Sequence, residues 1–267
     1  MIATGATSAS SVYGPVSSWR FGISLGVDPI LTNSACSFRC AYCQLGKINL
    51  HTTQRQLFVD ASQFRNDLLS SRSRWFSADV VTFAGSGEPT LAANLRELID
   101  IASTVTRKPI VILTNASLLN DASARNDLLA ASHISCKLDA ADEETFQRIN
   151  RPSDGVTLDG IIDGITALRS EYRGVLSLQT MILPSSRGSA AGLAKVVCRI
   201  GPDEIHLNLP SRPSPSQWSL PCRGDNQSIG GLRRVDDMAV NEFASELARY
   251  TSVRVLTRRE AIRSPTR

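Results

Sequence analysis

The chain has 267 residues, of which 42% are hydrophobic and 20% are charged, and its formal net charge is +4. The ordinary apolar fraction excludes wholesale disorder, and the length suits one large α/β domain or two small ones. No run approaches the roughly 20 consecutive apolar residues that span a bilayer, which excludes a membrane protein. The N-terminus lacks the basic start and apolar run of a secretory signal, so we expect a cytoplasmic protein. The mild positive charge permits a nucleic-acid partner without indicating one.

Short apolar runs alternate with helix-period segments along the chain. The Ser/Ala/Gly-rich residues 1–14 predict a flexible N-terminal tail. Strands are expected over residues 22–28, 79–83, 110–114, 134–138, 176–182 and 204–209. The clearest helical stripes are 95–102, 158–168 and 235–247. Four prolines interrupt the pattern after residue 209. We therefore expect a core domain over 15–209, followed by residues 210–267 as a long loop, a C-terminal helix and a basic tail.

The repeated alternation of strands and helices predicts a parallel sheet with helices outside it. Six strands over roughly 190 residues suit either a partial TIM-like barrel or a doubly wound sheet. In both architectures, ligands bind at the C-terminal ends of the strands. Unusual polar positions gather there, at residues 85–90, Asn115, 137–139, Gln179 and Asn208.

Three of the six cysteines fall within eight residues, at Cys36, Cys40 and Cys43. Disulfides are a poor explanation in a cytosolic chain. The C-x3-C-x2-C spacing lets three thiolates on one short loop bind three irons of a cubane iron–sulfur cluster. The fourth iron then has no cysteine, and an open coordination position is what a catalytic metal centre needs. A ligand with an amine and a carboxylate can fill that position.

Two other interpretations of the cysteine segment stay open. Positions i, i+4 and i+7 share one face of a helix, so the three cysteines could pack in a core. The polar residues between them do not make a helical stripe, which disfavours this interpretation. The three cysteines and His51 could instead bind zinc as a Cys3His site.

Four segments together resemble a known family. The C-x3-C-x2-C motif, with Tyr42 before its third cysteine, resembles the radical SAM superfamily. The segment GSGEPT at 85–90 resembles that superfamily's Gly-Gly-Glu element. YGPV…SLGVD within 13–28 and KLDA…NRP within 137–152 resemble the small radical SAM proteins related to archaeal tRNA wyosine synthase. The resemblance covers about residues 13–210.

The resemblance implies an α/β fold, a partial TIM-like (β/α)6 barrel of parallel strands with outer helices. It implies a 4Fe–4S cluster bound by Cys36, Cys40 and Cys43, with S-adenosylmethionine bound to the open iron. Reductive cleavage would give methionine and a 5′-deoxyadenosyl radical that abstracts hydrogen from a substrate. An electron donor such as a flavodoxin or a ferredoxin is implied as a partner. The residues expected around S-adenosylmethionine are Tyr42, Gly85, Ser86, Gly87, Glu88, Asn115, Lys137, Asp139, Gln179 and Asn208.

The residue types at these positions indicate individual roles. The glycines of 85–90 let the backbone pass close to a small ligand, and Glu88 either binds that ligand or supports the loop. Asn115 is a ligand contact or a turn residue. Lys137 and Asp139 share one face of their strand. We expect them to bind a carboxylate or a ribose, with a strand-end salt bridge as the alternative.

Polar residues on later strands carry weaker signals. Gln179 lies on an otherwise apolar strand and needs partners, which a ligand or the core could supply. His206 is expected to be structural rather than catalytic, and Arg20 to bind an anion or brace the cysteine loop. The remaining cysteines are interpreted by their settings, as core residues at Cys136 and Cys198 and as a candidate substrate-side thiol at Cys222.

Three functions stay open. The first is a radical SAM enzyme that acts on a small molecule or a peptide. The second is a tRNA-modifying radical SAM enzyme. Wyosine synthases carry a second cluster bound by cysteines ahead of the main motif, whereas no cysteine precedes Cys36 here, and the weak charge does not indicate a tRNA footprint. The third is a non-catalytic zinc-binding module.

Overall fold

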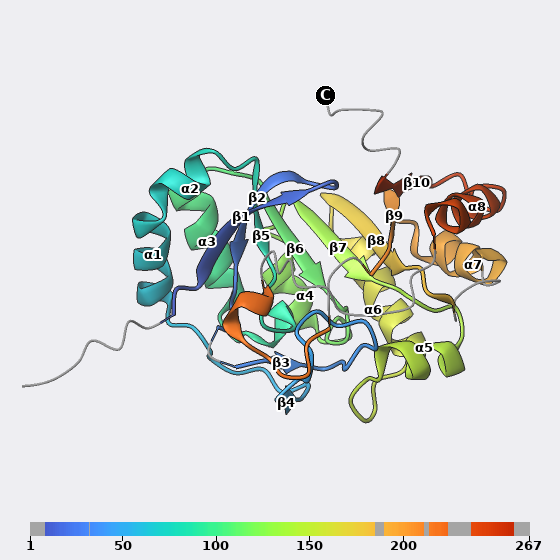
Figure 1. Cartoon of the computed structure of the whole chain (residues 1–267), viewed down its shortest axis with the longest axis horizontal. Coiled ribbons are helices and arrows are strands. Elements are labelled where there is room, and N and C mark those ends of the chain that lie inside the picture. Colours follow the sequence, from blue (N-terminus) through green and yellow to red (C-terminus); the bar gives the residue numbers. More distant parts are fainter. Residues whose placement is uncertain (1–8, 32, 185–189, 211–213, 224–235, 259–267) are drawn as a thin grey trace, which may run out of the picture.

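The computed structural model describes residues 9–31, 33–184, 190–210, 214–223 and 236–258. An eight-stranded sheet runs through it in the order β1-β2-β5-β6-β7-β8-β9-β10 (Figure 1). Its strands are β1 Val12–Ser18, β2 Gly22–Val27, β5 Val80–Phe83, β6 Ile110–Thr114, β7 His133–Lys137, β8 Val175–Met181, β9 Glu204–Asn208 and β10 Arg254–Thr257. A small separate ladder pairs β3 Ala35–Cys36 with β4 Leu50–His51.

Helices connect successive strands of the sheet. The α-helices are α1 Ala61–Ser70, α2 Arg72–Phe76, α3 Leu95–Thr106, α4 Ala122–Leu128, α5 Glu143–Asn150, α6 Leu158–Glu171, α7 Ala190–Ile200 and α8 Asp237–Leu247. Two short 3-10 turns are η1 Pro89–Leu91 and η3 Leu220–Arg223. Within the described ranges, no helix combines the length and the apolar character needed to cross a bilayer.

From β2 to β10 every neighbouring pair of strands is parallel, and each crossover contains at least one helix. Parallel strands require such crossovers, which place the helices on the outside of the curled sheet. The predicted α/β half-barrel is therefore confirmed. Each of the six expected strands is present and differs from its expected bounds by at most one residue.

The sheet has an additional strand at each edge. β1 begins at Val12, inside the segment 1–14 that the sequence predicts as a flexible tail. Val12 is buried and pairs with Val27, because the antiparallel hairpin β1–β2 closes this edge of the sheet. Residues 1–8 lie outside the described residues. At the other edge β10 pairs in parallel with β9, so the segment after residue 209 also contributes to the sheet. Of that segment, 211–213, 224–235 and 259–267 lie outside the described residues.

The outer face of the sheet is the hydrophobic core. Side chains such as Phe83, Ile112, Ile134, Leu178 and Ile205 are fully buried there beneath the helices. Helix starts follow local sequence, since side chains just before them accept hydrogen bonds from the first free backbone N–H groups. These capping residues are Asp60, Asp121, Asp142, Thr157 and Asp236.

The inner face of the sheet, opposite the helices, is polar and aromatic. The turn between β1 and β2 places Phe21 5.1 Å from the His133 ring and Trp19 5.7 Å from the His206 ring, between ring centroids. His206 is 1% exposed, and its Nε2 lies 2.9 Å from a Glu204 carboxylate oxygen. These contacts fill the inner face near the N-terminal ends of the strands. Other residues line the inner face at the C-terminal ends of the strands.

Stability is expected to fall in mild acid because of this aromatic cluster. Burial, aided by the charge of His206, lowers the pKa of His133 from 6.5 to about 4. The folded state therefore holds His133 neutral, and its contribution is complete above pH 6.5 and is lost as the pH falls toward 4. We expect the free energy of unfolding to decrease by about 1–2 kcal/mol from this residue between pH 7 and pH 5. Urea unfolding at both pH values tests this, and an equal decrease in a His133→Gln variant would contradict it.

Candidate active site

The cysteine loop lies at the C-terminal ends of the central strands. In Figure 1 the segment with β3 and β4 runs along one end of the sheet. Ala35 pairs with Gly87, which follows β5. The loop also contacts the end of α5, where the Ala41 N–H donates to the Ile149 carbonyl oxygen at 2.8 Å. Backbone pairing on two sides fixes the path of this segment.

The three thiols of Cys36, Cys40 and Cys43 lie close together at this end of the barrel. Burial raises the pKa of all three, that of Cys40 to about 12, and repulsion from the other thiols of the motif raises the values of Cys36 and Cys40 further. The Cys43 N–H donates to the Cys40 carbonyl oxygen at 3.0 Å, and Cys36 and Cys43 pack against the same small buried cluster. Thiols with such pKa values stay protonated alone, and binding of a metal centre would replace the protons. Three soft sulfur donors without a fourth from the same motif fit a 4Fe–4S cluster with one open iron.

Two side-chain amides point at these sulfurs. Asn115 Nδ2 lies 3.5 Å from Cys36 Sγ, and Asn150 Nδ2 lies 3.5 Å from Cys40 Sγ. N–H donors to the sulfurs stabilise the more negative, reduced state of an iron–sulfur cluster. Both amides come from strand or helix ends, namely the end of β6 and the last residue of α5. This supporting layer fits the same group as the thiols.

The segment 85–88 follows β5 and packs directly on the cysteine loop. The Ala35 N–H donates to the Ser86 carbonyl oxygen at 3.0 Å, and the Glu88 N–H donates to the Ala35 carbonyl oxygen at 3.0 Å. A Cβ at Gly87 would lie 1.6 Å from the Ala35 carbonyl oxygen, so only glycine allows this approach. Gly87 is therefore needed first for contact between the two loops, whereas the role predicted from the sequence is close approach to a ligand.

Glu88 supports this loop from within. Its carboxylate is 2% exposed and accepts hydrogen bonds from the Thr90 N–H and hydroxyl, the Thr114 hydroxyl and the Asn115 N–H. Burial raises the pKa of Glu88, although these four donors act in the opposite direction. Of the two roles that the sequence left open, these contacts favour support of the loop. Glu88 also joins the ends of β5 and β6.

Asn115 serves the cysteine loop in the described contacts. Besides its contact with Cys36, its Nδ2 donates to the Ser37 hydroxyl at 2.8 Å. Its Oδ1 accepts from the Ser117 N–H at 3.0 Å, which is the turn role that the sequence left open. The side chain is thus a brace between the end of β6 and the cysteine loop.

Lys137, Asp139 and Tyr42 form one polar cluster beside Cys40. Lys137 Nζ lies 3.4 Å from Asp139 Oδ1 and 4.8 Å from the centroid of the Tyr42 ring. The Asp139 carboxylate is buried and accepts from the Tyr42 hydroxyl, from Asn150 Nδ2 at 2.7 Å and from the Met181 N–H at 2.8 Å. These contacts match the strand-end salt bridge, which was the alternative to ligand binding in the sequence analysis. Asp139 ties the cysteine loop to α5 and β8.

Gln179 and Asn208 lie on the inner face near this cluster. Gln179 is in register with Lys137 on one side and His206 on the other, and Asn208 is in register with Met181. The Gln179 side-chain oxygen accepts a hydrogen bond from the Arg20 guanidinium. Arg20 thus contacts the inner face of the sheet, whereas the sequence predicts that it binds an anion or braces the cysteine loop. The structure brings all ten expected cofactor residues to the C-terminal half of the barrel.

Sequence reasoning missed the contacts that three parts of the site make. Asp28 follows β2 and accepts hydrogen bonds from the Ser86 N–H and hydroxyl. It stands at a strand end, and the rule that pointed to Asn115 could have identified it. Asn150 is the last residue of α5, and no local sequence pattern predicts that this helix packs on the cysteine loop. Residues 214–223 pack on the cysteine loop although the sequence indicates only a loop there.

The zinc interpretation of the cysteine segment finds no support in these contacts. His51 Nε2 lies 3.1 Å from the Ser37 carbonyl oxygen, a contact within the protein. Within the described ranges, no three His, Cys, Asp or Glu side chains converge on the position of a single metal ion. The sulfurs that bind a cubane 4Fe–4S cluster lie farther apart than the ligands of a single metal ion, because each sulfur binds a different iron.

The other cysteines divide between core and surface. Cys136 is fully buried on β7, as expected. Cys198 was expected in the core and is exposed, which corrects that prediction. The apolar stripe of α7 runs through Leu193, Ala194 and Val197, and Cys198 lies on the next, outward-facing position of the helix.

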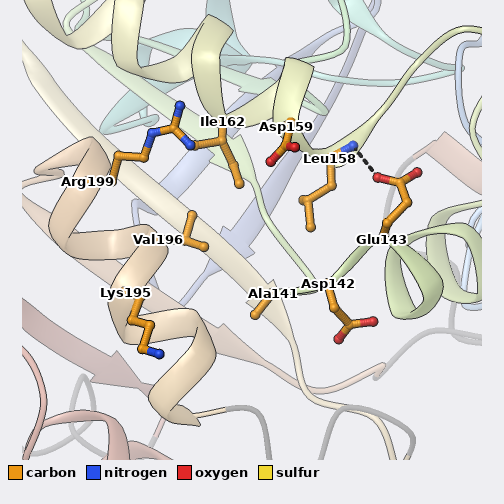
Figure 2. A pocket seen from close by; sticks show the side chains of 9 residues that line it. All are labelled: Ala141, Asp142, Glu143, Leu158, Asp159, Ile162, Lys195, Val196 and Arg199. Carbon is orange, nitrogen blue, oxygen red and sulfur yellow. Dashed lines mark hydrogen bonds between the residues drawn. The ribbon is translucent and has the colours of Figure 1, made fainter.

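A pocket of about 300 Å³ lies away from this site, among α5, α6 and α7 (Figure 2). Both signs of charge line it, with Asp142, Glu143 and Asp159 at or beside α5 and α6, and Lys195 and Arg199 on α7. Glu143 accepts a hydrogen bond from the Leu158 N–H at 2.7 Å, which caps the start of α6. None of the residues expected around the cofactor lines this pocket, so its charged groups belong to the outer helix layer.

Comparisons with known proteins identify the family. The model of the radical SAM superfamily matches residues 30–187, which include the cysteine loop and the segment 85–88. The chain belongs to the radical SAM superfamily. A UPF0026 protein of Synechocystis sp. is 44% identical to this radical SAM protein over 250 residues, which are 91% of this chain and 94% of that protein.

Solved structures agree with the fold of this radical SAM protein. The structure of TYW1 with a lysine-pyruvate adduct bound has a TM-score of 0.61 at 13% identity, over 86% of this chain and 74% of that chain. SuiB of Streptococcus suis bound to the precursor peptide SuiA has a TM-score of 0.63 at 14% identity. That match covers 90% of this chain but only 50% of SuiB. At such identities the likeness concerns the fold alone.

The family assignment confirms the predicted resemblance. The protein is a radical SAM enzyme with a partial TIM barrel, and the family implies S-adenosylmethionine and a 4Fe–4S cluster as its cofactors. Radical SAM enzymes in general need a reductant. A non-catalytic zinc module is not compatible with this assignment.

The amide donors give a measurable prediction. Replacing Asn115 with alanine removes an N–H donor to Cys36, so we expect a more negative reduction potential of the reconstituted cluster. Loss of such a supporting residue also lowers metal-site affinity by about 10- to 100-fold. Spectroscopic redox titration and iron analysis measure both effects. The control is Asn94→Ala, since the Asn94 amide donates to the Val59 carbonyl oxygen and Asn94 immediately precedes α3, away from the site. An unchanged potential in Asn115→Ala would contradict the assigned role.

Proposed function

We propose that Cys36, Cys40 and Cys43 hold a 4Fe–4S cluster with which this enzyme cleaves S-adenosylmethionine. The cluster and S-adenosylmethionine together supply one-electron reductive cleavage to methionine and a 5′-deoxyadenosyl radical, which takes a hydrogen atom from the substrate. The observation that supports this most is the backbone pairing of Ala35 with the segment 86–88, at the mouth of the barrel. It brings the three half-buried cysteines next to the loop that carries the family's second motif.

The residues of this chain have three tasks in the proposed function. The thiols bind iron, and their half-buried position limits contact of the metal with water. Glu88 and Asp139 hold the surrounding loops in one arrangement through buried hydrogen bonds. The backbone of 85–88 and the amide of Asn115 border the space that S-adenosylmethionine would occupy. Because the cofactors supply the chemistry, the protein contributes position, charge and exclusion of water.

We place the organic substrate on the inner face of the half-barrel. Lys137 and Gln179 share that face beyond the cysteine loop, and Asn208 lies one layer farther toward the strand ends. A cation and two amides recognise oxygen-rich groups, so the substrate is expected to be polar. A small molecule, a peptide and a tRNA nucleoside all meet this condition. The reductant is proposed to be a flavodoxin or a ferredoxin.

Production of 5′-deoxyadenosine tests the proposed function. The protein is reconstituted with iron and sulfide without oxygen, reduced, and mixed with S-adenosylmethionine. We expect 5′-deoxyadenosine and methionine in equal amounts. A protein that holds four irons yet releases neither product would overturn the proposal. Metabolites, peptides and modified nucleosides compared between cells with and without the gene then identify the substrate, and an unchanged nucleoside profile would exclude tRNA.

A further inference from the structure

A segment from the C-terminal part of the chain covers the cysteine loop. We call residues 214–223, which include η3, the strap. It lies beside β3 in Figure 1, in orange. Gln44 Nε2 donates to the Cys222 carbonyl oxygen at 3.2 Å. A Cβ at Gly46 would lie 2.2 Å from the Pro215 carbonyl oxygen, so the strap and the cysteine loop are in direct backbone contact.

The strap is also anchored to the other side of the site. Arg223 is 8% exposed, and its guanidinium lies 3.3 Å from Asp28 Oδ2 and donates to the Ser10 carbonyl oxygen at 2.8 Å. Asp28 in turn binds Ser86 through both its backbone and its hydroxyl. The strap thus joins the cysteine loop to the segment 85–88. These are the two loops between which the proposed cofactor site lies.

This anchoring brings a fourth thiol to the site. Cys222 is 2% exposed and packs with Leu45 and Ile48 in a small buried cluster that also contacts Cys36 and Cys43. Gln44, the residue after Cys43, also donates to the Cys222 carbonyl oxygen, so the backbone of Cys222 lies against the cysteine loop as well. Four of the six cysteines therefore meet at one end of the barrel, although Cys222 is about 180 positions away in sequence.

We propose that Cys222 binds the fourth iron of the cluster when S-adenosylmethionine is absent and gives way when it arrives. This inference rests on the proposed function. A soft thiolate is a favoured iron ligand, and a thiol held beside the cluster competes at high effective concentration. The thiol releases its proton when its sulfur binds iron. When the amino and carboxylate groups of S-adenosylmethionine take that position, the thiolate leaves and regains a proton, and no electron is transferred.

Such a ligand has two consequences. It keeps the fourth iron in the cluster while no cofactor is bound, because a three-cysteine site otherwise loses that iron first. It also weakens the apparent binding of S-adenosylmethionine, since only clusters without the internal ligand accept it. If Cys222 occupies nine clusters in ten, its removal tightens apparent binding about 10-fold.

The test compares the wild-type protein with Cys222→Ser and Cys222→Ala, each reconstituted without oxygen. The first measurement is the EPR signal of the three-iron cluster after brief oxidation, with and without saturating S-adenosylmethionine. The second is the apparent Kd for S-adenosylmethionine, from its effect on the EPR spectrum of the reduced cluster. The control is Cys198→Ser, on the exposed side of α7.

We expect the Cys222 variants to lose iron faster than wild type only without S-adenosylmethionine, and to bind it several-fold more tightly. Serine retains the size of the side chain, so its agreement with alanine separates ligand loss from disturbed packing. Equal iron loss and equal affinity in wild type and both variants would overturn the inference. Failure of the wild-type protein itself to assemble a four-iron cluster would instead contradict the proposed function.

Discussion

Replacing Cys40 with alanine is expected to abolish both cluster assembly and cleavage of S-adenosylmethionine. Cys40 is the central member of the motif and interacts electrostatically with both Cys36 and Cys43. A supporting residue already changes metal affinity by about 10- to 100-fold, so loss of a direct ligand should exceed about 100-fold. Iron and sulfide analysis, the visible absorption of the cluster and the rate of 5′-deoxyadenosine formation measure the effect.

Cys198→Ala is the matched control for that experiment. It removes a cysteine of the same chain that is exposed on α7, so the iron content and the rate should both equal those of wild type. Cys40→Ala protein that still contained four irons and formed 5′-deoxyadenosine at the wild-type rate would show that the motif does not hold the cluster.

Replacing Asp139 with alanine should destabilise the fold by about 3–5 kcal/mol, because removal of one partner leaves the remaining buried polar groups unpaired. The groups left behind are Lys137, the Tyr42 hydroxyl, the Asn150 amide and the Met181 N–H. The change also releases the cysteine loop, since Tyr42 of that loop donates to this carboxylate, as does Asn150 at the end of α5, whose amide contacts Cys40. We therefore expect reduced cluster retention together with reduced stability.

Denaturant unfolding of the cluster-free protein measures the stability change without interference from iron. The matched control is Asp100→Asn, which breaks an exposed ion pair with Arg96 on α3. Exposed pairs contribute about 0–1 kcal/mol, so this variant should remain close to wild type. A loss at Asp139 no larger than that at Asp100 would mean that the buried cluster does not hold the loops together.

We therefore expect the stability of the site to depend on residues other than the three cysteines. The described hydrogen bonds of these residues are made with protein groups around the cysteine loop, as seen for Glu88, Asn115 and Asp139. A radical enzyme needs its reactive atoms fixed and shielded, and a buried, satisfied polar network supplies that rigidity. Such residues are positioning groups, and their variants should affect cluster retention before they affect chemistry.

The sequence by itself determined the core of the fold and the grouping of three cysteines on one loop. Short β-rich runs alternate with helical stripes, a local pattern that each segment carries independently, and the six strands appeared where that pattern placed them. The three cysteines lie within eight residues, so their spacing alone brings three sulfurs together on one loop. Cys198 shows the limit of local reasoning, because its apolar neighbours occupy a different side of α7.

Only the tertiary structure decided what the polar residues at the strand ends contact. Glu88 and Asp139 look like ligand-binding residues in the sequence, but their partners come from other strands and from α5, and pairing across the sheet cannot be deduced from any one segment. The same holds for Cys222, which reaches the cysteine loop because Arg223 is buried against Asp28. Sequence pattern predicts the secondary structure around a residue and the face on which its side chain lies. Long-range contacts arise only when the sheet assembles and its buried polar groups must all find partners.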